Sequence, residues 1–171
     1  MAEKVGLSSG GDVLIIGGGI SGVTVALELA QSGIPFTLIE TESSLGGLSA
    51  SFSCKASESC NKCFACVADK RISEIHPGEG MSILTRTEVT GVKGNGRKHQ
   101  VTLKKGKEKI DLEVSAVVVA AGIDPFDASQ KVEYGYGRYK NVITAKDLDE
   151  MLRFRGILSR PSDGKLPKTI A

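Results

Sequence analysis

The sequence of 171 residues has no tryptophan, and aromatic residues make up only 5% of it. Surfaces that bind single-stranded nucleic acids stack bases on aromatic side chains, so the composition argues against such a surface. An excess of charge of one sign is also missing, because 22 Lys and Arg residues are balanced by 20 Asp and Glu residues. Since nucleic-acid-binding domains usually show a strong basic excess, we expect no nucleic acid as a partner.

Long apolar runs are lacking as well. No segment of the sequence reaches the roughly 18 consecutive apolar residues that span a bilayer, so no direct membrane span is expected. Residues 1–11 lack the apolar stretch of a secretory signal and are expected to form a flexible N-terminus. With only two histidines, the sequence indicates no nucleophile–histidine pair. These absences favour a protein of the cytoplasm.

Glycine is abundant, with 21 residues, and it is concentrated where a tight turn is expected. Residues 17–22 read Gly-Gly-Gly-Ile-Ser-Gly, which fits the pattern G-x-G-x-x-G. In that pattern Gly17 permits the tight turn, Gly19 lets the backbone approach a diphosphate, and Gly22 lets a helix pack against a strand. The N-terminus of the helix then offers free N–H groups to the phosphates.

The context of this turn supports the same interpretation. An apolar run at 12–16 predicts a buried strand before the turn, and apolar residues spaced three and four apart predict a helix over 20–31. A second strand, 35–40, ends at Glu40, whose carboxylate can accept hydrogen bonds from a ribose. Because a carboxylate there disfavours a 2′-phosphate, FAD or NAD is expected ahead of NADP.

The rest of the chain predicts further strands and one helix. A short strand is expected at 82–85, and alternating apolar residues predict an antiparallel meander over 89–92, 99–103 and 110–114. A buried strand at 116–121, a short strand at 141–144 and an amphipathic helix at 146–154 follow. The predicted fold is α/β, a Rossmann-like doubly wound parallel sheet with an inserted antiparallel β-meander. We expect one FAD-binding domain over 12–154 and a linker over 155–171.

The four cysteines all lie within residues 54–66, in a spacing of C-x5-C-x2-C-x2-C. Four thiols this close together in a reduced compartment indicate metal or redox chemistry. Four thiolates suit a [4Fe–4S] cluster, and they also suit tetrahedral zinc. A redox-active cysteine pair beside a flavin is a third possibility. The candidate metal ligands are Cys54, Cys60, Cys63 and Cys66.

Several of these features resemble the FAD-binding half of the glutathione reductase superfamily. A second glycine pair, Gly46-Gly47, follows Glu40, and Ala120-Ala121-Gly122 ends the strand after the meander. The resemblance implies FAD as the cofactor and a backbone contact between Val89 and the adenine. The implied cofactor-binding residues are Gly17, Gly18, Gly19, Ile20, Ser21, Gly22, Glu40, Thr41, Gly46, Gly47, Leu48, Val89, Ala120, Ala121 and Gly122.

Later segments narrow the resemblance to the A-subunit of heterodisulfide reductase and the related flavoprotein of the quinone-interacting membrane-bound oxidoreductase complex. They include the cysteine loop, residues 121–128, Glu133-Tyr134-Gly135-Tyr136-Gly137 and residues 160–165. The resemblance implies an oxidoreductase in which FAD and a [4Fe–4S] cluster transfer electrons among the subunits of a complex. It also implies a second domain beyond the linker. A flavin-dependent disulfide reductase and a zinc-stapled, non-catalytic assembly protein stay open as alternatives.

Overall fold

The computed structural model describes residues 13–56, 58–60, 62–94 and 96–171, so the expected flexible N-terminus lies outside the described residues. The chain forms two compact units. The first unit takes in the chain up to Ala50 together with Val67–Gly122, and the second unit combines Ser51–Cys66 with Ile123–Ala171. The cysteine loop therefore belongs to the same unit as the C-terminal segment.

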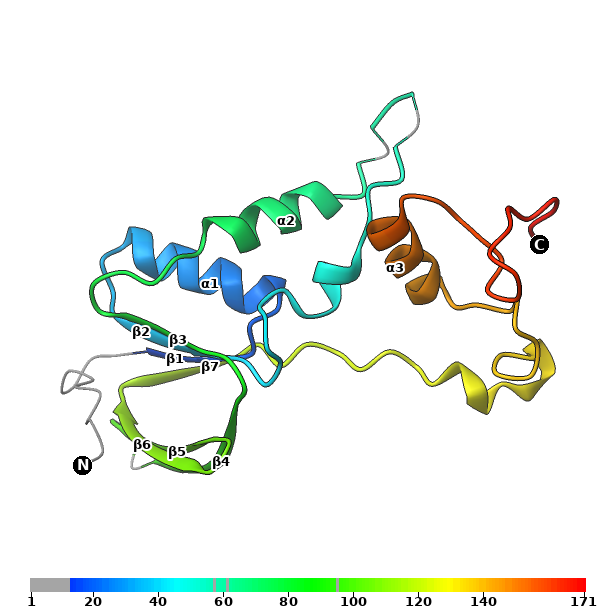
Figure 1. The fold of residues 1–171 in the computed structure, drawn as a ribbon. Helices are drawn as coiled ribbons and strands as arrows, with labels where there is room; N and C mark the ends of the chain where they lie inside the picture. Colours follow the sequence, from blue (N-terminus) through cyan, green and yellow to red (C-terminus); the bar gives the residue numbers. More distant parts are fainter. Residues whose placement is uncertain (1–12, 57, 61, 95) are drawn as a thin grey trace. The chain divides into compact units, whose positions relative to one another are not determined.

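A four-stranded parallel sheet forms the centre of the first unit (Figure 1). Its strands are β1 (Val13–Ile16), β2 (Phe36–Ile39), β3 (Met81–Leu84) and β7 (Ala116–Val119). They pair in the order β3-β2-β1-β7. The two central strands, β1 and β2, are apolar along most of their length because both faces of the sheet are covered.

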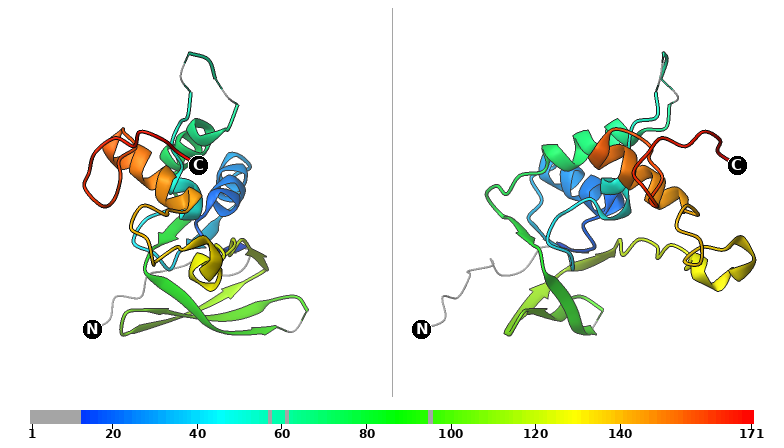
Figure 2. Two further views of the ribbon diagram at one scale, coloured as in Figure 1. Left: turned by 90° about the vertical axis from the view of Figure 1, so that its right-hand side faces the viewer. Right: turned by 45° about the vertical axis from the view of Figure 1, so that its right-hand side comes forward.

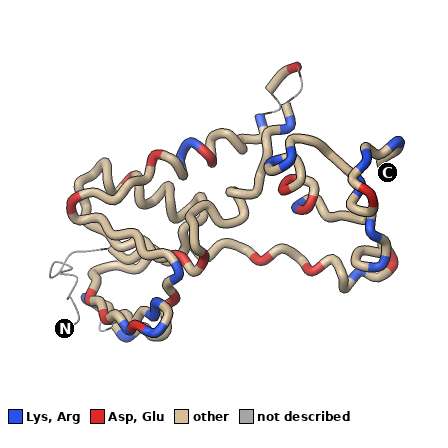
Figure 3. Tube along the Cα trace, viewed as in Figure 1, with Lys and Arg blue, Asp and Glu red and all other residues tan. Residues whose placement is uncertain are grey.

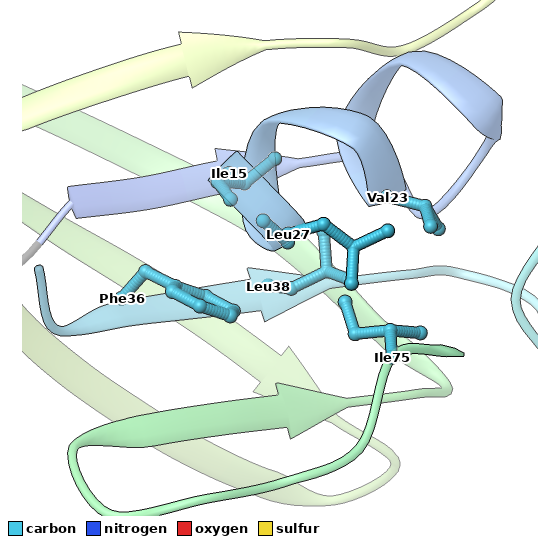
Figure 4. Close-up of a cluster of buried hydrophobic side chains, with 7 residues drawn as sticks. Ile15, Val23, Leu27, Phe36, Leu38 and Ile75 are labelled. Atoms are coloured by element: carbon cyan, nitrogen blue, oxygen red, sulfur yellow. The ribbon is translucent and has the colours of Figure 1, made fainter. Parts of the chain in front are cut away.

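One face of this sheet is covered by α1 (Ile20–Gln31), whose bounds are those that the sequence predicted. The part of α2 (Ala65–Glu74) that lies in the first unit is on the same face. Side chains of α1 and the sheet form a buried cluster with Ile75, drawn in Figure 4. The cluster consists of Ile15, Val23, Ala26, Leu27, Phe36, Leu38 and Ile75.

The opposite face is covered by a three-stranded antiparallel sheet, as two further views show (Figure 2). Its strands are β4 (Thr87–Gly94), β5 (His99–Lys105) and β6 (Glu108–Val114). Because side chains alternate along β1, Leu14 packs against this sheet while its neighbour Ile15 packs against α1. The predicted Rossmann-like parallel sheet with an antiparallel meander is therefore confirmed.

Charges of both signs are interspersed over the meander (Figure 3). Ion pairs join lysines to acids on it: Lys98 to Glu113, Lys104 to Glu88 and Lys109 to Asp111. Exposed pairs of this kind contribute at most about 1 kcal/mol each. Their main effect is to balance the lysines that are concentrated in this part of the sequence.

The second unit contains short 3₁₀ turns and the helix α3 (Ala145–Arg155). The strand predicted at 141–144 is wrong. The N–H of Val142 donates to the carbonyl of Tyr139 at 3.0 Å in a turn, and Thr144 forms a capping box with Asp147 at the start of α3. Among the described residues, no helix combines the length and the apolar character needed to cross a membrane.

Candidate functional site

The glycine-rich turn joins β1 to α1 and brings three backbone segments together. Gly17 has φ = 106°, and a Cβ placed on it would lie 2.3 Å from the carbonyl oxygen of Ala120. A Cβ on Gly22 would lie 1.9 Å from the carbonyl oxygen of Gly17. Both positions therefore require glycine, because β7 and α1 each approach the turn closely.

Gly19 differs from these two glycines because no atom comes within 4 Å of a Cβ built on it. It is the N-cap of α1, with φ of −69°, and no side chain caps this end of the helix. The N–H groups of Ile20, Ser21 and Gly22 precede the first intrahelical bond, which runs from Val23 to Gly19. The turn thus leaves open space in front of a helix N-terminus, where the helix dipole favours an anion.

Glu40 ends β2 and is 8% exposed. Its Oε2 accepts a hydrogen bond from the N–H of Gly18 at 2.8 Å, and its Oε1 accepts the N–H of Glu42 at 2.9 Å and the Thr41 hydroxyl at 3.0 Å. Burial alone would raise the pKa of Glu40, but these hydrogen bonds outweigh burial and lower the pKa. The ionised carboxylate therefore fixes the glycine turn and keeps a negative charge beside it.

The second glycine pair lies against the first glycine turn. The N–H of Gly46 donates to the carbonyl of Gly18 at 2.7 Å, and Gly46 forms an isolated parallel bridge with Gly19. A Cβ on Gly47 would lie 3.3 Å from the Cα of Gly19. Two glycine-rich segments, distant in the sequence, thus border the same open helix N-terminus.

The remaining predicted cofactor residues lie around this turn in the first unit. Leu48 is half-buried in the 3₁₀ helix η1 (Gly47–Ser51). The Cα of Ala121 is 3.2 Å from a Cβ built on Gly17, whereas Gly122 has open surroundings. Val89 lies on β4 two residues after Thr87, whose N–H donates to the carbonyl of Glu40 at 2.9 Å.

Sequence reasoning missed Ser49, which is buried and whose hydroxyl donates to the carbonyl of Gly46 at 2.6 Å. This hydrogen bond helps to hold the second glycine pair in place. Its position three residues after a glycine with positive φ is the only signal in the sequence, and a serine in a Ser- and Gly-rich loop does not stand out.

The four cysteines of the second unit are exposed free thiols. Lys62 and Phe64, on either side of Cys63, have φ of 52° and 61°, so the loop turns sharply around this cysteine. The N–H of Ala65 and then the N–H and charge of Lys55 lower the pKa of the Cys63 thiol against a smaller opposing effect of burial. Among the described residues, no three His, Cys, Asp or Glu side chains converge closely enough to hold a metal ion.

Comparisons with known proteins agree with this geometry. The sequence model of the family described as NAD(P)-binding Rossmann-like domain matches residues 15–79. The crystal structure of L-proline dehydrogenase from P. horikoshii superposes with a TM-score of 0.55 and 33% identity. That superposition covers 66% of this chain and 22% of the dehydrogenase chain.

Curated relatives carry the name of one reductase component. The A-subunit of the ferredoxin/F(420)H(2)-dependent CoB-CoM heterodisulfide reductase of Methanosarcina acetivorans is 27% identical over 94% of this chain and 30% of its own length. The A-subunit of the H(2):CoB-CoM heterodisulfide,ferredoxin reductase of Methanothermobacter thermautotrophicus is 44% identical over 37% of this chain and 10% of its own. The chain thus spans about a third or less of the length of these relatives. The resemblance predicted from the sequence is confirmed, and the chain is a homologue of the heterodisulfide reductase A-subunit over nearly its whole length.

Proposed function

We propose that this chain binds FAD and serves as the electron-transferring part of an oxidoreductase that resembles heterodisulfide reductase. One observation carries the proposal: the Gly46-Gly47 pair is hydrogen-bonded to the glycine turn at an uncapped helix N-terminus, next to the ionised Glu40. A single glycine turn suits many dinucleotides, whereas the additional glycine pair at the same place suits the long FAD molecule. The homology to named reductase subunits supports the same function.

The residues of the first unit suit FAD in a definite order along the molecule. The N–H groups at the start of α1 would bind the diphosphate, because the space in front of Gly19 is open. The Glu40 carboxylate would accept hydrogen bonds from the ribose, and its charge would repel a 2′-phosphate. The backbone of Val89 would contact the adenine. Thr41, Leu48 and residues 120–122 complete the proposed binding set.

In the second unit we propose a [4Fe–4S] cluster held by Cys54, Cys60, Cys63 and Cys66. The donor set fits, since all four side chains are free thiols in one loop and the lowered pKa of Cys63 favours its thiolate. When bound, FAD would supply two-electron chemistry and the cluster would supply one-electron transfer. The protein's task would be to bind both groups and to keep the four sulfurs reduced and accessible.

The proposal extends to partners and compartment. Relatives are named as subunits of reductases, so we propose that this chain works with other subunits of such a complex. We also place it in the cytoplasm, where thiols stay reduced, with no nucleic acid among its partners.

Anaerobic purification followed by cofactor analysis tests this function. We expect FAD to bind in a titration that compares FAD, NAD and NADP, and we expect iron and sulfide near four of each per chain, as about four metal and four sulfide ions make one such cluster. Visible absorption and electron paramagnetic resonance then report the two groups separately.

Other outcomes of the same analysis would contradict the proposal. A protein that binds zinc and no flavin would indicate the non-catalytic assembly protein. A protein with flavin, no iron and one titratable cysteine pair would indicate a disulfide reductase. A colourless preparation without metal after reconstitution with FAD, iron and sulfide would refute both parts of the proposal.

A further inference from the structure

One helix of the second unit carries an acid that is nearly buried. Asp149 of α3 is 9% exposed. The next residue, Glu150, instead forms an ion pair with Lys146 in which both side chains are more than 40% exposed. Withdrawing a carboxylate from water is costly unless it is paired and hydrogen-bonded, so Asp149 calls for partners of its own.

Those partners come from the start of the cysteine loop, more than 90 positions earlier in the sequence. The Oδ1 atom of Asp149 accepts the N–H of Ser53 at 3.0 Å and the Ser53 hydroxyl at 3.2 Å. The same oxygen forms an ion pair with the ammonium group of Lys55. Burial alone would raise the pKa of Asp149, but Lys55 and Ser53 outweigh burial and lower it, so the carboxylate is ionised at neutral pH.

A second residue of α3 contacts the same segment one helical turn later. Nη1 of Arg153 donates to the carbonyl of Phe52 at 2.8 Å. Within the segment, the ammonium group of Lys55 also donates to the carbonyl of Ser53 at 3.1 Å. Residues 52–55 are therefore held from both sides of Cys54, because Ser53 and Lys55 are its two neighbours in the chain.

We propose that Asp149, supported by Arg153, is a positioning residue that fixes the backbone at Cys54 so that this cysteine can act as the fourth ligand of the metal centre. The proposal rests on the cluster of the proposed function and goes beyond it, since it assigns α3 to the metal site. Cys54 lies five residues before the compact C-x2-C-x2-C run and needs its own support. Fixing its backbone in advance lowers the entropy that is lost when the thiolate binds.

The test compares full-length chains reconstituted anaerobically with iron and sulfide. The variant Asp149→Asn keeps the shape of the side chain but leaves the Lys55 charge without its counter-ion. We expect it to release iron to a chelator at least about tenfold faster than the wild type, as the loss of roughly one charge-assisted interaction implies. The matched control is Glu150→Gln on the same helix, which should release iron at the wild-type rate.

A double-mutant cycle tells positioning from general support of the fold. If Asp149 acts through Cys54, then Asp149→Asn adds nothing to the faster iron release of Cys54→Ala. Independent, multiplicative effects of the two substitutions would overturn the proposal, as would wild-type iron release by Asp149→Asn. Arg153→Gln provides a second variant with the same expectation if Asp149→Asn does not fold.

A measurement without metal keeps this proposal separate from the proposed function. In the metal-free protein, hydrogen exchange at the Ser53 amide should be at least about tenfold faster in Asp149→Asn than in Glu150→Gln. Unchanged exchange would show that Asp149 does not hold this segment, whatever the cluster does. Faster exchange in the variant of a chain whose wild type never takes up iron would refute the cluster, and with it the role of Asp149 toward a ligand.

Discussion

Two glycines of the same turn are predicted to respond in opposite ways to replacement by alanine. In Gly22→Ala the new Cβ would lie 1.9 Å from the carbonyl oxygen of Gly17 and 3.4 Å from Cγ2 of Ile15. Carbon and oxygen atoms that are not bonded need more than about 3 Å, so the two backbones must separate by at least about 1 Å. The helix α1 would then move away from the sheet against which Val23 and Leu27 pack.

The size of this effect follows from two opposing contributions. Overpacking a buried contact costs about 1–3 kcal/mol, whereas alanine gains about 0.8–1.0 kcal/mol over glycine inside a helix. Because the contact joins backbone to backbone, side-chain rotation cannot relieve it. We expect Gly22→Ala to lower the free energy of unfolding by about 1–2 kcal/mol, which is a fall in Tm of roughly 2–8 °C for a chain of this size.

Gly19→Ala tests the other half of the reasoning. The backbone at Gly19, with φ of −69° and ψ of −178°, suits alanine, and no atom lies within 4 Å of the added carbon. The small loss of an N-cap glycine is offset by the lower entropy of the unfolded chain, so stability should change by less than about 0.5 kcal/mol. The methyl group would occupy the space proposed for the diphosphate, and we expect the FAD dissociation constant to rise at least about tenfold.

Urea unfolding followed by far-UV circular dichroism measures the stability of each ligand-free variant, and a titration of FAD fluorescence measures binding. A Gly22→Ala protein as stable as the wild type would refute the packing argument. Wild-type FAD affinity in Gly19→Ala would refute the placement of the diphosphate at this helix N-terminus.

Two further predictions concern Glu40 and α3. Because its pKa is lowered in the folded protein, ionised Glu40 contributes stability above its ordinary pKa of 4.5 and loses it as the pH falls through the lowered value; Glu40→Gln should therefore flatten the acid limb of a stability–pH profile from urea unfolding. Thr144→Ala removes the capping box with Asp147 and should cost the second unit about 1 kcal/mol, seen as faster hydrogen exchange in the first turn of α3; Thr169→Ala, in the C-terminal segment, should leave that exchange unchanged.

The sequence predicted the first unit better than the second because periodicity there is strong and local. The bounds of α1 were predicted without error, and the four parallel strands and the meander are all present, with ends that differ by a few residues at most. The residues at 141–144 are apolar and β-branched enough to suggest a strand, yet Thr144 uses its hydroxyl to cap a helix. Local capping outweighed β-propensity at that point.

The candidate site was predictable to the extent that it depends on motifs. The glycines and Glu40 stand at positions where spacing alone assigns a task to each residue. The contact of Asp149 with Ser53 could not be predicted, since it joins residues 96 positions apart and Asp149 lies among Lys146, Asp147 and Glu150 on a helix that looks solvent-exposed from its sequence. For the same reason the assignment of residues 51–66 and 123–171 to one compact unit has no signature in the sequence.

The pairing of β1 with β7 sets a condition on how this chain folds. Ile16 lies opposite Val119, so about a hundred residues must be gathered before the central strand has both neighbours. The meander consists of local hairpins, and once formed it shortens the effective loop between β3 and β7. A nascent chain that has not yet reached Ala116 exposes β1 as an apolar strand edge, which makes this interval the one most vulnerable to aggregation during synthesis.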